Sequence, residues 1–170
     1  MSIIKPLITA TALMISLTIN AQTCNSHIKD EWQNNRYTDK GDGTILDKST
    51  NLIWKKCTQG LSGNDCATGS ATTTNWQQAL QQANNSTFAG KSDWRLPNIK
   101  ELSSLVRRNC HSQAINEALF PNTANYFWSS SPHSNYLSSA WAVDFNVDFG
   151  RVISDYRYNS KWVRLVRSGQ

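Results

Sequence analysis

Four cysteines constrain this chain more than any other feature of its sequence, because disulfides fix which distant segments lie together. They stand at positions 24, 57, 66 and 110 of 170 residues, and four cysteines allow three pairings. The short separation of Cys57 from Cys66 favours a local bridge, which leaves Cys24 for Cys110. In a chain-entropy description the short loop would stabilise the fold by about 2.7 kcal/mol and the long one by about 4.6 kcal/mol.

The first 21 residues have the pattern of a secretory signal peptide. Lys5 precedes a largely apolar run from Leu7 to Ile19, and the small residue Ala21 suits cleavage after it. The run is too short for a transmembrane anchor. We therefore expect residues 22–170 to be exported across the inner membrane to the periplasm, the cell surface or the medium, where disulfides persist.

Cys24 lies so close to the cleavage point that a lipoprotein signal must be weighed. That signal needs a small residue directly before the acylated cysteine, and Thr23 fits it poorly. We expect a soluble product with a paired Cys24. Lipidation is the alternative, and it excludes a disulfide at this residue.

The exported part is one domain in size and only mildly basic. Its 149 residues suit a single hydrophobic core, and we see no repeat or linker. Loss of Lys5 leaves 16 basic and 12 acidic residues, a net charge of +4. This is a weak bias towards anionic partners, and we expect no nucleic-acid partner.

The pattern of residues predicts an α+β fold. Residues 36–39, 44–47 and 52–56 read as a meander of strands, followed by a loop over 58–73 that the Cys57–Cys66 bridge would restrain. Further strands are predicted at 126–128, 141–149 and 161–167, with a turn at Gly150.

Two helices are expected between these strand regions. Thr74 and Gln77 have the spacing of a capping box, and Asn98 begins a second helix that closes near residues 107–109. Apolar residues follow each cap at helical intervals.

Several stretches together resemble the Lcl C-terminal domain family of bacterial proteins, long catalogued as a domain of unknown function. They are Tyr37–Asp39 with Gly41–Thr44, Asn51–Cys57, Asp93–Asn98 with Lys100–Leu102, Phe127–Ser131 and Val163–Arg167. The resemblance covers nearly the whole exported part.

The resemblance implies a C-type-lectin-like fold, akin also to formylglycine-generating enzymes, with a twisted antiparallel sheet and two helices. It also implies binding, because the founding adhesins hold sulfated glycosaminoglycans with this domain as a trimer. This sequence has 8 glycines and no collagen-like repeat, so trimerisation through a collagen stalk is in doubt.

The motif Trp94-Arg95-Leu96-Pro97 allows two interpretations. It could form a binding platform, with an aromatic face for sugars and a guanidinium for an acid. We favour a structural role, in which Trp94 fills the core and Arg95 pairs with an acid or with carbonyl groups. The motif, like Trp128, is therefore diagnostic of the fold rather than of a ligand.

We expect no catalytic centre, cofactor or metal cluster. Ser129–Ser131 lack a recognisable partner among His27, His111 and His133. No cysteine or histidine cluster has metal-ligand spacing, although one calcium ion held by Asp and Asn oxygens stays open. An enzyme related to formylglycine-generating enzymes is a third hypothesis, and a free thiol would favour it.

The strongest functional signal is a set of basic and aromatic residues in the second half of the chain. Arginine suits sulfate and carboxylate recognition. The sequence therefore predicts a non-enzymatic module that binds an anionic glycan, and the alternative is a protein-interaction or assembly subunit of a surface or pilus complex, since interfaces favour the same residues. The expected ligand-binding residues are Arg107, Arg108, Arg151, Arg157, Tyr158, Lys161 and Arg164.

Overall fold

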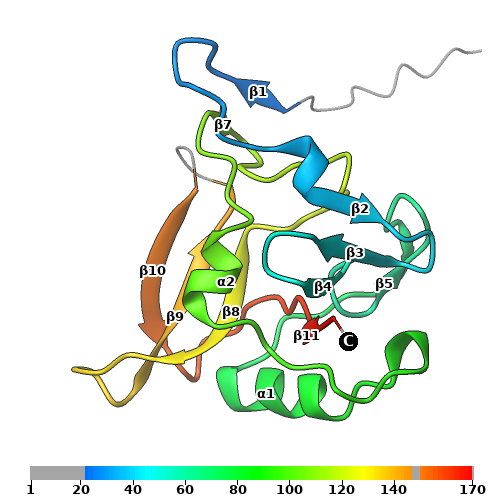
Figure 1. Cartoon of the computed structure of the whole chain (residues 1–170). Coiled ribbons are helices and arrows are strands. Elements are labelled where there is room, and N and C mark those ends of the chain that lie inside the picture. Colours follow the sequence, from blue (N-terminus) through cyan, green and yellow to red (C-terminus); the bar gives the residue numbers. More distant parts are fainter. Residues whose placement is uncertain (1–21, 147–149, 170) are drawn as a thin grey trace, which may run out of the picture.

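The computed structural model describes residues 22–146 and 150–169, so the expected signal peptide, residues 1–21, lies outside the described residues. Two antiparallel sheets form the frame of this part, together with two helices and two short strand pairs (Figure 1). The predicted α+β class is therefore correct.

The four-stranded sheet has the order β11-β4-β3-β2. The predicted meander is confirmed as β2 (Tyr37–Asp39), β3 (Thr44–Asp47) and β4 (Leu52–Lys55). Gly43 has a φ of 81° in the turn between β2 and β3, a backbone conformation that glycine adopts without strain. The last described strand is β11 (Val166–Ser168), which pairs with β4.

The three-stranded sheet has the order β10-β9-β8. It is formed by β8 (Tyr126–Pro132), β9 (Ser139–Asp144) and β10 (Arg151–Tyr156). The prediction was wrong in two respects: β9 ends at Asp144, and β10 was not foreseen. Residues 147–149 of the expected long strand lie outside the described residues.

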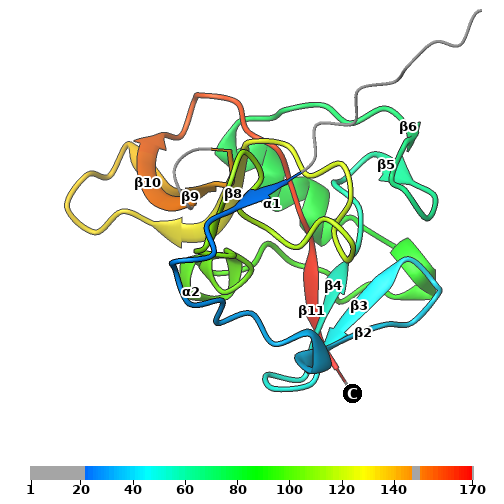
Figure 2. The same cartoon turned by 90° about the horizontal axis from the view of Figure 1, so that it is seen from above.

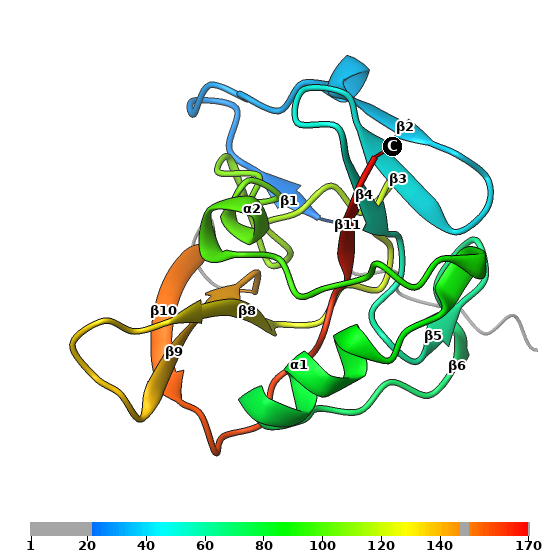
Figure 3. The same cartoon turned by 60° about the horizontal axis from the view of Figure 1, so that its bottom comes forward.

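The predicted strand 161–167 is mostly irregular, since β11 starts only at Val166. Before it, Lys161 bridges Thr74 and Trp162 bridges Phe127, so this segment joins the two sheets. In Figure 3 it passes α1 (Trp76–Asn84) and then runs beside β4.

Both helices exist, with different bounds from those predicted. The N-cap of α1 is Asn75, whose side chain accepts a hydrogen bond from the Gln78 N–H (2.9 Å), because the main chain of Thr74 pairs with Lys161. The Asn98 capping box of α2 is confirmed. However, α2 spans only Ile99–Ser103, and the Arg107 N–H donates to the Ala114 carbonyl instead of continuing the helix.

Two buried clusters form the core. One contains Trp54, Leu102 and Phe127, and α2 packs against it; the other contains Trp94, Trp128 and Leu165, with α1 against it. The motif tryptophans Trp94 and Trp128 are both buried, which agrees with the structural interpretation.

Both expected disulfides are present. Cys57–Cys66 closes a loop that contains β5 (Leu61–Ser62), and β6 (Thr68–Gly69) follows just after it. Cys24–Cys110 joins β1 (Thr23–Cys24) to β7 (Cys110–His111). The N-terminal segment is thereby tied beside the chain that follows α2 (Figures 1 and 2). All four cysteines are paired, so none offers a free thiol.

None of the helices in the described ranges is both long and apolar enough to cross a membrane.

Candidate functional site

The seven expected ligand-binding residues do not form one surface. Two are buried, two share a groove beside α1, one lies on β10, and two line a cleft between α2 and the N-terminal segment. Each group has a different chemical role.

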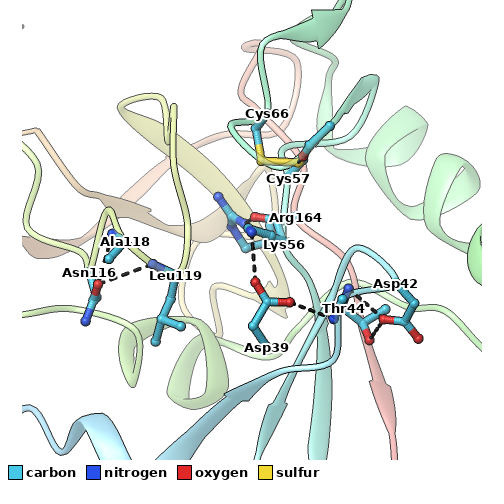
Figure 4. Close-up of polar contacts among 12 residues, drawn as sticks. Asp39, Asp42, Thr44, Lys56, Cys57, Cys66, Asn116, Ala118, Leu119 and Arg164 are labelled. Carbon is cyan, nitrogen blue, oxygen red and sulfur yellow. Dashed lines mark hydrogen bonds and ion pairs between the residues drawn. A yellow bond between two sulfur atoms is a disulfide. The ribbon is translucent and has the colours of Figure 1, made fainter.

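Arg164 was wrongly expected on the exposed surface, because it is fully buried. Its guanidinium donates to the Lys55 and Lys56 carbonyl oxygens and to the Thr123 hydroxyl oxygen (2.8 Å), and Figure 4 shows it beside Lys56. It also lies over the ring of Phe120, at 4.9 Å. Burial lowers its pKa to about 9. Arg164 therefore ties the end of β4 to the C-terminal segment.

Lys161 is a second correction, since its side chain is only 6% exposed. The ammonium pairs with Asp155 and lies 4.9 Å from the centre of the Trp128 ring. Aromatic rings and one carboxylate replace the water that this charge would otherwise hold. It is not available to a ligand.

Arg157 and Tyr158 line a shallow groove of about 410 Å³ at the start of α1. The Arg157 guanidinium stacks over Trp76 at 4.4 Å and donates to the Ser139 carbonyl (3.1 Å). Tyr158 is 72% exposed and stacks on Tyr156. Arg157 is thus largely committed to the fold.

Arg151 begins β10 and is exposed, with its Nε 3.7 Å from an oxygen of Asp144. It lines neither the groove nor the cleft.

The remaining pair, Arg107 and Arg108, lines a second concave feature. We call it the basic cleft; its volume is about 490 Å³. It lies between the N-terminal segment and α2, which run close together in Figures 2 and 3. Its lining residues are Glu31, Trp32, Gln33, Arg36, Tyr37, Ser49, Lys100, Ser103, Ser104, Val106, Arg107 and Arg108.

Two sets of contacts build one wall of the basic cleft from the N-terminal segment. The Cys24–Cys110 disulfide and an ion pair between Asp30 and Arg107 hold the segment to the chain that follows α2. Trp32 then stacks flat on Tyr37, with ring centres 4.6 Å apart. The wall is therefore aromatic, and its place depends on the disulfide.

The cations of the basic cleft differ in how far they are neutralised. Arg36 is paired with Asp47 (2.7 Å) and Arg107 with Asp30. Lys100 and Arg108 form no ion pair to any residue in the described ranges, and both are exposed. These two charges can meet an anion without first losing a partner.

The aromatic wall also carries two buried polar groups. The Trp32 indole N–H has no hydrogen-bond partner among the described atoms, whereas the Tyr37 hydroxyl lies near the Ser104 side chain. Burial raises the pKa of Tyr37 to about 12, so its hydroxyl keeps its proton and can donate. A buried donor left unpaired is unusual, and the Trp32 N–H could reach a ligand oxygen only if the wall shifts.

The sequence interpretation missed Trp32, Arg36, Tyr37 and Lys100 as members of this site. The signal that could have found them is the expected Cys24–Cys110 bridge, which carries the residues after Cys24 towards the end of α2.

The serine-rich strand end has structural contacts. The Ser129 hydroxyl donates to the Trp141 carbonyl (2.7 Å), and the Ser131 hydroxyl oxygen accepts from the Ile99 N–H (3.0 Å). The ring of His133 stacks on Trp141. Within residues 22–146 and 150–169, no group of three or more His, Cys, Asp or Glu residues could hold a metal ion.

Together these features define an α+β domain, linked by two disulfides, with a basic cleft beside an aromatic wall. The sequence model of the Lcl C-terminal domain family matches residues 43–167. The chain therefore belongs to the Lcl C-terminal domain family, as its motifs indicate. A search of curated proteins found no match.

Proposed function

We propose that this protein is an exported, non-enzymatic module that binds an anionic glycan in the basic cleft. The observation that carries the proposal is that two unneutralised cations, Lys100 and Arg108, line the same cleft as the stacked aromatic wall of Trp32 and Tyr37.

The chemistry of the basic cleft suits an acidic sugar. A guanidinium donates parallel hydrogen bonds to a sulfate or carboxylate, while a lysine adds a point charge. The stacked rings of Trp32 and Tyr37 offer an apolar edge for the neutral part of the ligand. Because Lys100 and Arg108 are exposed, salt should screen the interaction strongly.

The finer expectations from the sequence belong to the same proposal. They are cleavage of residues 1–21, export to the periplasm, cell surface or medium, and a C-type-lectin-like architecture. Membership of the Lcl C-terminal domain family and the two disulfides support them. Assembly with another protein is the alternative function, and the exposed side chains of Leu137 and Tyr158 favour it.

Retention of the purified, oxidised protein on immobilised heparin, eluted with a salt gradient, tests the proposal. We expect retention that fades with salt and a much earlier elution for the double variant Lys100→Ala, Arg108→Ala. The matched control is Lys40→Ala, Lys91→Ala, which removes the same charge from exposed turns outside the basic cleft. Equal loss in both variants, or no retention at low salt, would contradict the proposal. Stoichiometric, salt-insensitive capture of a protein would favour the alternative.

A further inference from the structure

The edge strand β10 presents an unpaired main chain. Among the described strands it pairs only with β9, in an unbroken register from Arg151 opposite Asp144 to Tyr156 opposite Ser139, and it lies at the outer edge of its sheet in Figure 1. Just beyond β10, the Arg157 N–H donates to the Ser138 carbonyl (2.8 Å). Because antiparallel bonding alternates along a strand, odd-numbered residues of β10 bond to β9. Residues 152, 154 and 156 therefore direct their N–H and C=O groups outward.

Only part of this edge is protected. The Tyr156 N–H donates to the Asp155 carboxylate (2.8 Å), and its carbonyl accepts from the Asn159 N–H (3.0 Å). Val152 and Ser154 have no such partners in the described part of the chain. The strand has no proline and no bulge, and Val152 is 44% exposed. Proline and bulges are two of the devices that protect natural edge strands; charged side chains are a third, and β10 carries them only towards its two ends, at Arg151 and Asp155.

We propose that β10 is a self-association edge, at which two copies of this chain pair their β10 strands antiparallel about a two-fold axis through Ile153. This register sets Val152 opposite Ser154 of the second copy, and Ser154 opposite Val152 of the second copy. The four free N–H groups and four free C=O groups of the two strands then form four hydrogen bonds. The three-stranded sheets become one continuous six-stranded sheet.

Charge selects this register over its neighbours. Arg151 stands opposite Asp155 of the second copy at both ends of the pairing, where it would join Lys161 as a second cation on that carboxylate. The Arg151 side chain is 62% exposed and only loosely paired with Asp144, at 3.7 Å, so it can reach the second copy. A slip of two residues in one direction would set Arg151 opposite Arg157 of the second copy instead. Opposite charges across a strand pair stabilise it, and like charges destabilise it.

A cysteine placed on the axis tests the pairing in a register-specific way. Ile153 would lie opposite Ile153 of the second copy as a non-hydrogen-bonded pair, with a Cα separation of about 4.5 Å. This separation lies within the range of disulfides. The native cysteines are all bridged, so mild oxidation of Ile153→Cys should cross-link the chain rapidly. The control Val152→Cys, which would face Ser154, should cross-link far more slowly.

Sedimentation velocity over a wide concentration range provides the second readout. We expect a reversible dimer of the unaltered protein and monomers of both Ser154→Pro and Arg151→Glu. Ser154→Pro removes an N–H that β9 does not use. Arg151→Glu leaves the main chain intact should the proline variant fold poorly, and Lys91→Glu is the matched charge change on an exposed turn. A monomer at every concentration, or equal cross-linking of both cysteine variants, would overturn the proposal. The same monomer result is expected if the strand of another protein, rather than a second copy, occupies this edge.

Discussion

At the scale of the residue, the molecule uses cations inside the fold as well as on its surface. Arg164 has no acidic partner within residues 22–146 and 150–169, yet it is fully buried. Carbonyl oxygens and the rings of Phe120 and Phe127 surround it. The charge is held by hydrogen bonds rather than by an ion pair.

Replacement of Arg164 by methionine should destabilise the fold by about 2–4 kcal/mol. The variant leaves buried carbonyl oxygens of Lys55 and Lys56 without a donor, and each such loss costs about 1–3 kcal/mol. Removal of the buried charge offsets part of it. Urea unfolding measures the change, with exposed Arg151→Met as the control. A loss below that of the control would contradict this role.

Asp47 should make the protein sensitive to acid. Its carboxylate is fully buried and accepts hydrogen bonds from Arg36, Ser49 and Thr50. Although burial alone would raise the pKa of this carboxyl, these hydrogen bonds hold it well below the usual range. A lowered pKa in the folded state stabilises at neutral pH, and this stabilisation is lost as pH falls below about 4.

The variant Asp47→Asn should therefore be less stable by about 2 kcal/mol at pH 7 and should lose less stability on acidification. The free energy of unfolding at neutral and at acidic pH, for both proteins, measures this. Parallel pH profiles would show that Asp47 is not the responsible group.

At the scale of the element, helix α1 begins one residue later than its capping-box pattern predicts. Asn75 caps the helix, while the buried Thr74 hydroxyl has no partner. We expect Asn75→Ala to lower the free energy of unfolding by about 1 kcal/mol. Thr74→Val, which replaces an unpaired hydroxyl by a methyl group of similar size, should be neutral or slightly stabilising. The opposite order of the two variants in thermal unfolding would support a Thr74 cap.

Sequence patterns predicted the elements that depend on interactions between residues close in sequence. The β2–β4 meander depends on turn residues such as Gly43, and the α2 start depends on the Asn98 capping box. β10 was missed because Val152 and Tyr156 are exposed, so its apolar residues do not alternate with its polar ones as a half-buried strand requires. The burial of Arg164 depends on tertiary contacts that no spacing reveals.

At the scale of the whole molecule, the Cys24–Cys110 disulfide couples stability to the candidate site. It closes a separation of 86 residues and holds the segment that carries Trp32. The double variant Cys24→Ser, Cys110→Ser should lose up to about 4.6 kcal/mol of stability. It should also lose retention on heparin under conditions in which the fold persists. Unchanged retention by the folded variant would show that the basic cleft does not need this tether.

Candidate residues could be predicted only where they are close in sequence to a recognisable motif. Arg107 and Arg108 were found because they follow α2, but Trp32 and Tyr37 reach the same cleft through a long disulfide-closed loop. The seven expected residues therefore do not form a single basic surface, and two of them, Lys161 and Arg164, are buried.

An NMR titration of the ¹⁵N-labelled protein with a heparin oligosaccharide tests whether an anionic glycan occupies the basic cleft. We expect the indole N–H resonance of Trp32 and the amide resonances of Lys100 and Arg108 to shift together and saturably, while the indole resonance of Trp76, in the groove beside α1, does not move. Shifts centred on Trp76 and Tyr158, or no saturable shift at low salt, would contradict this proposal.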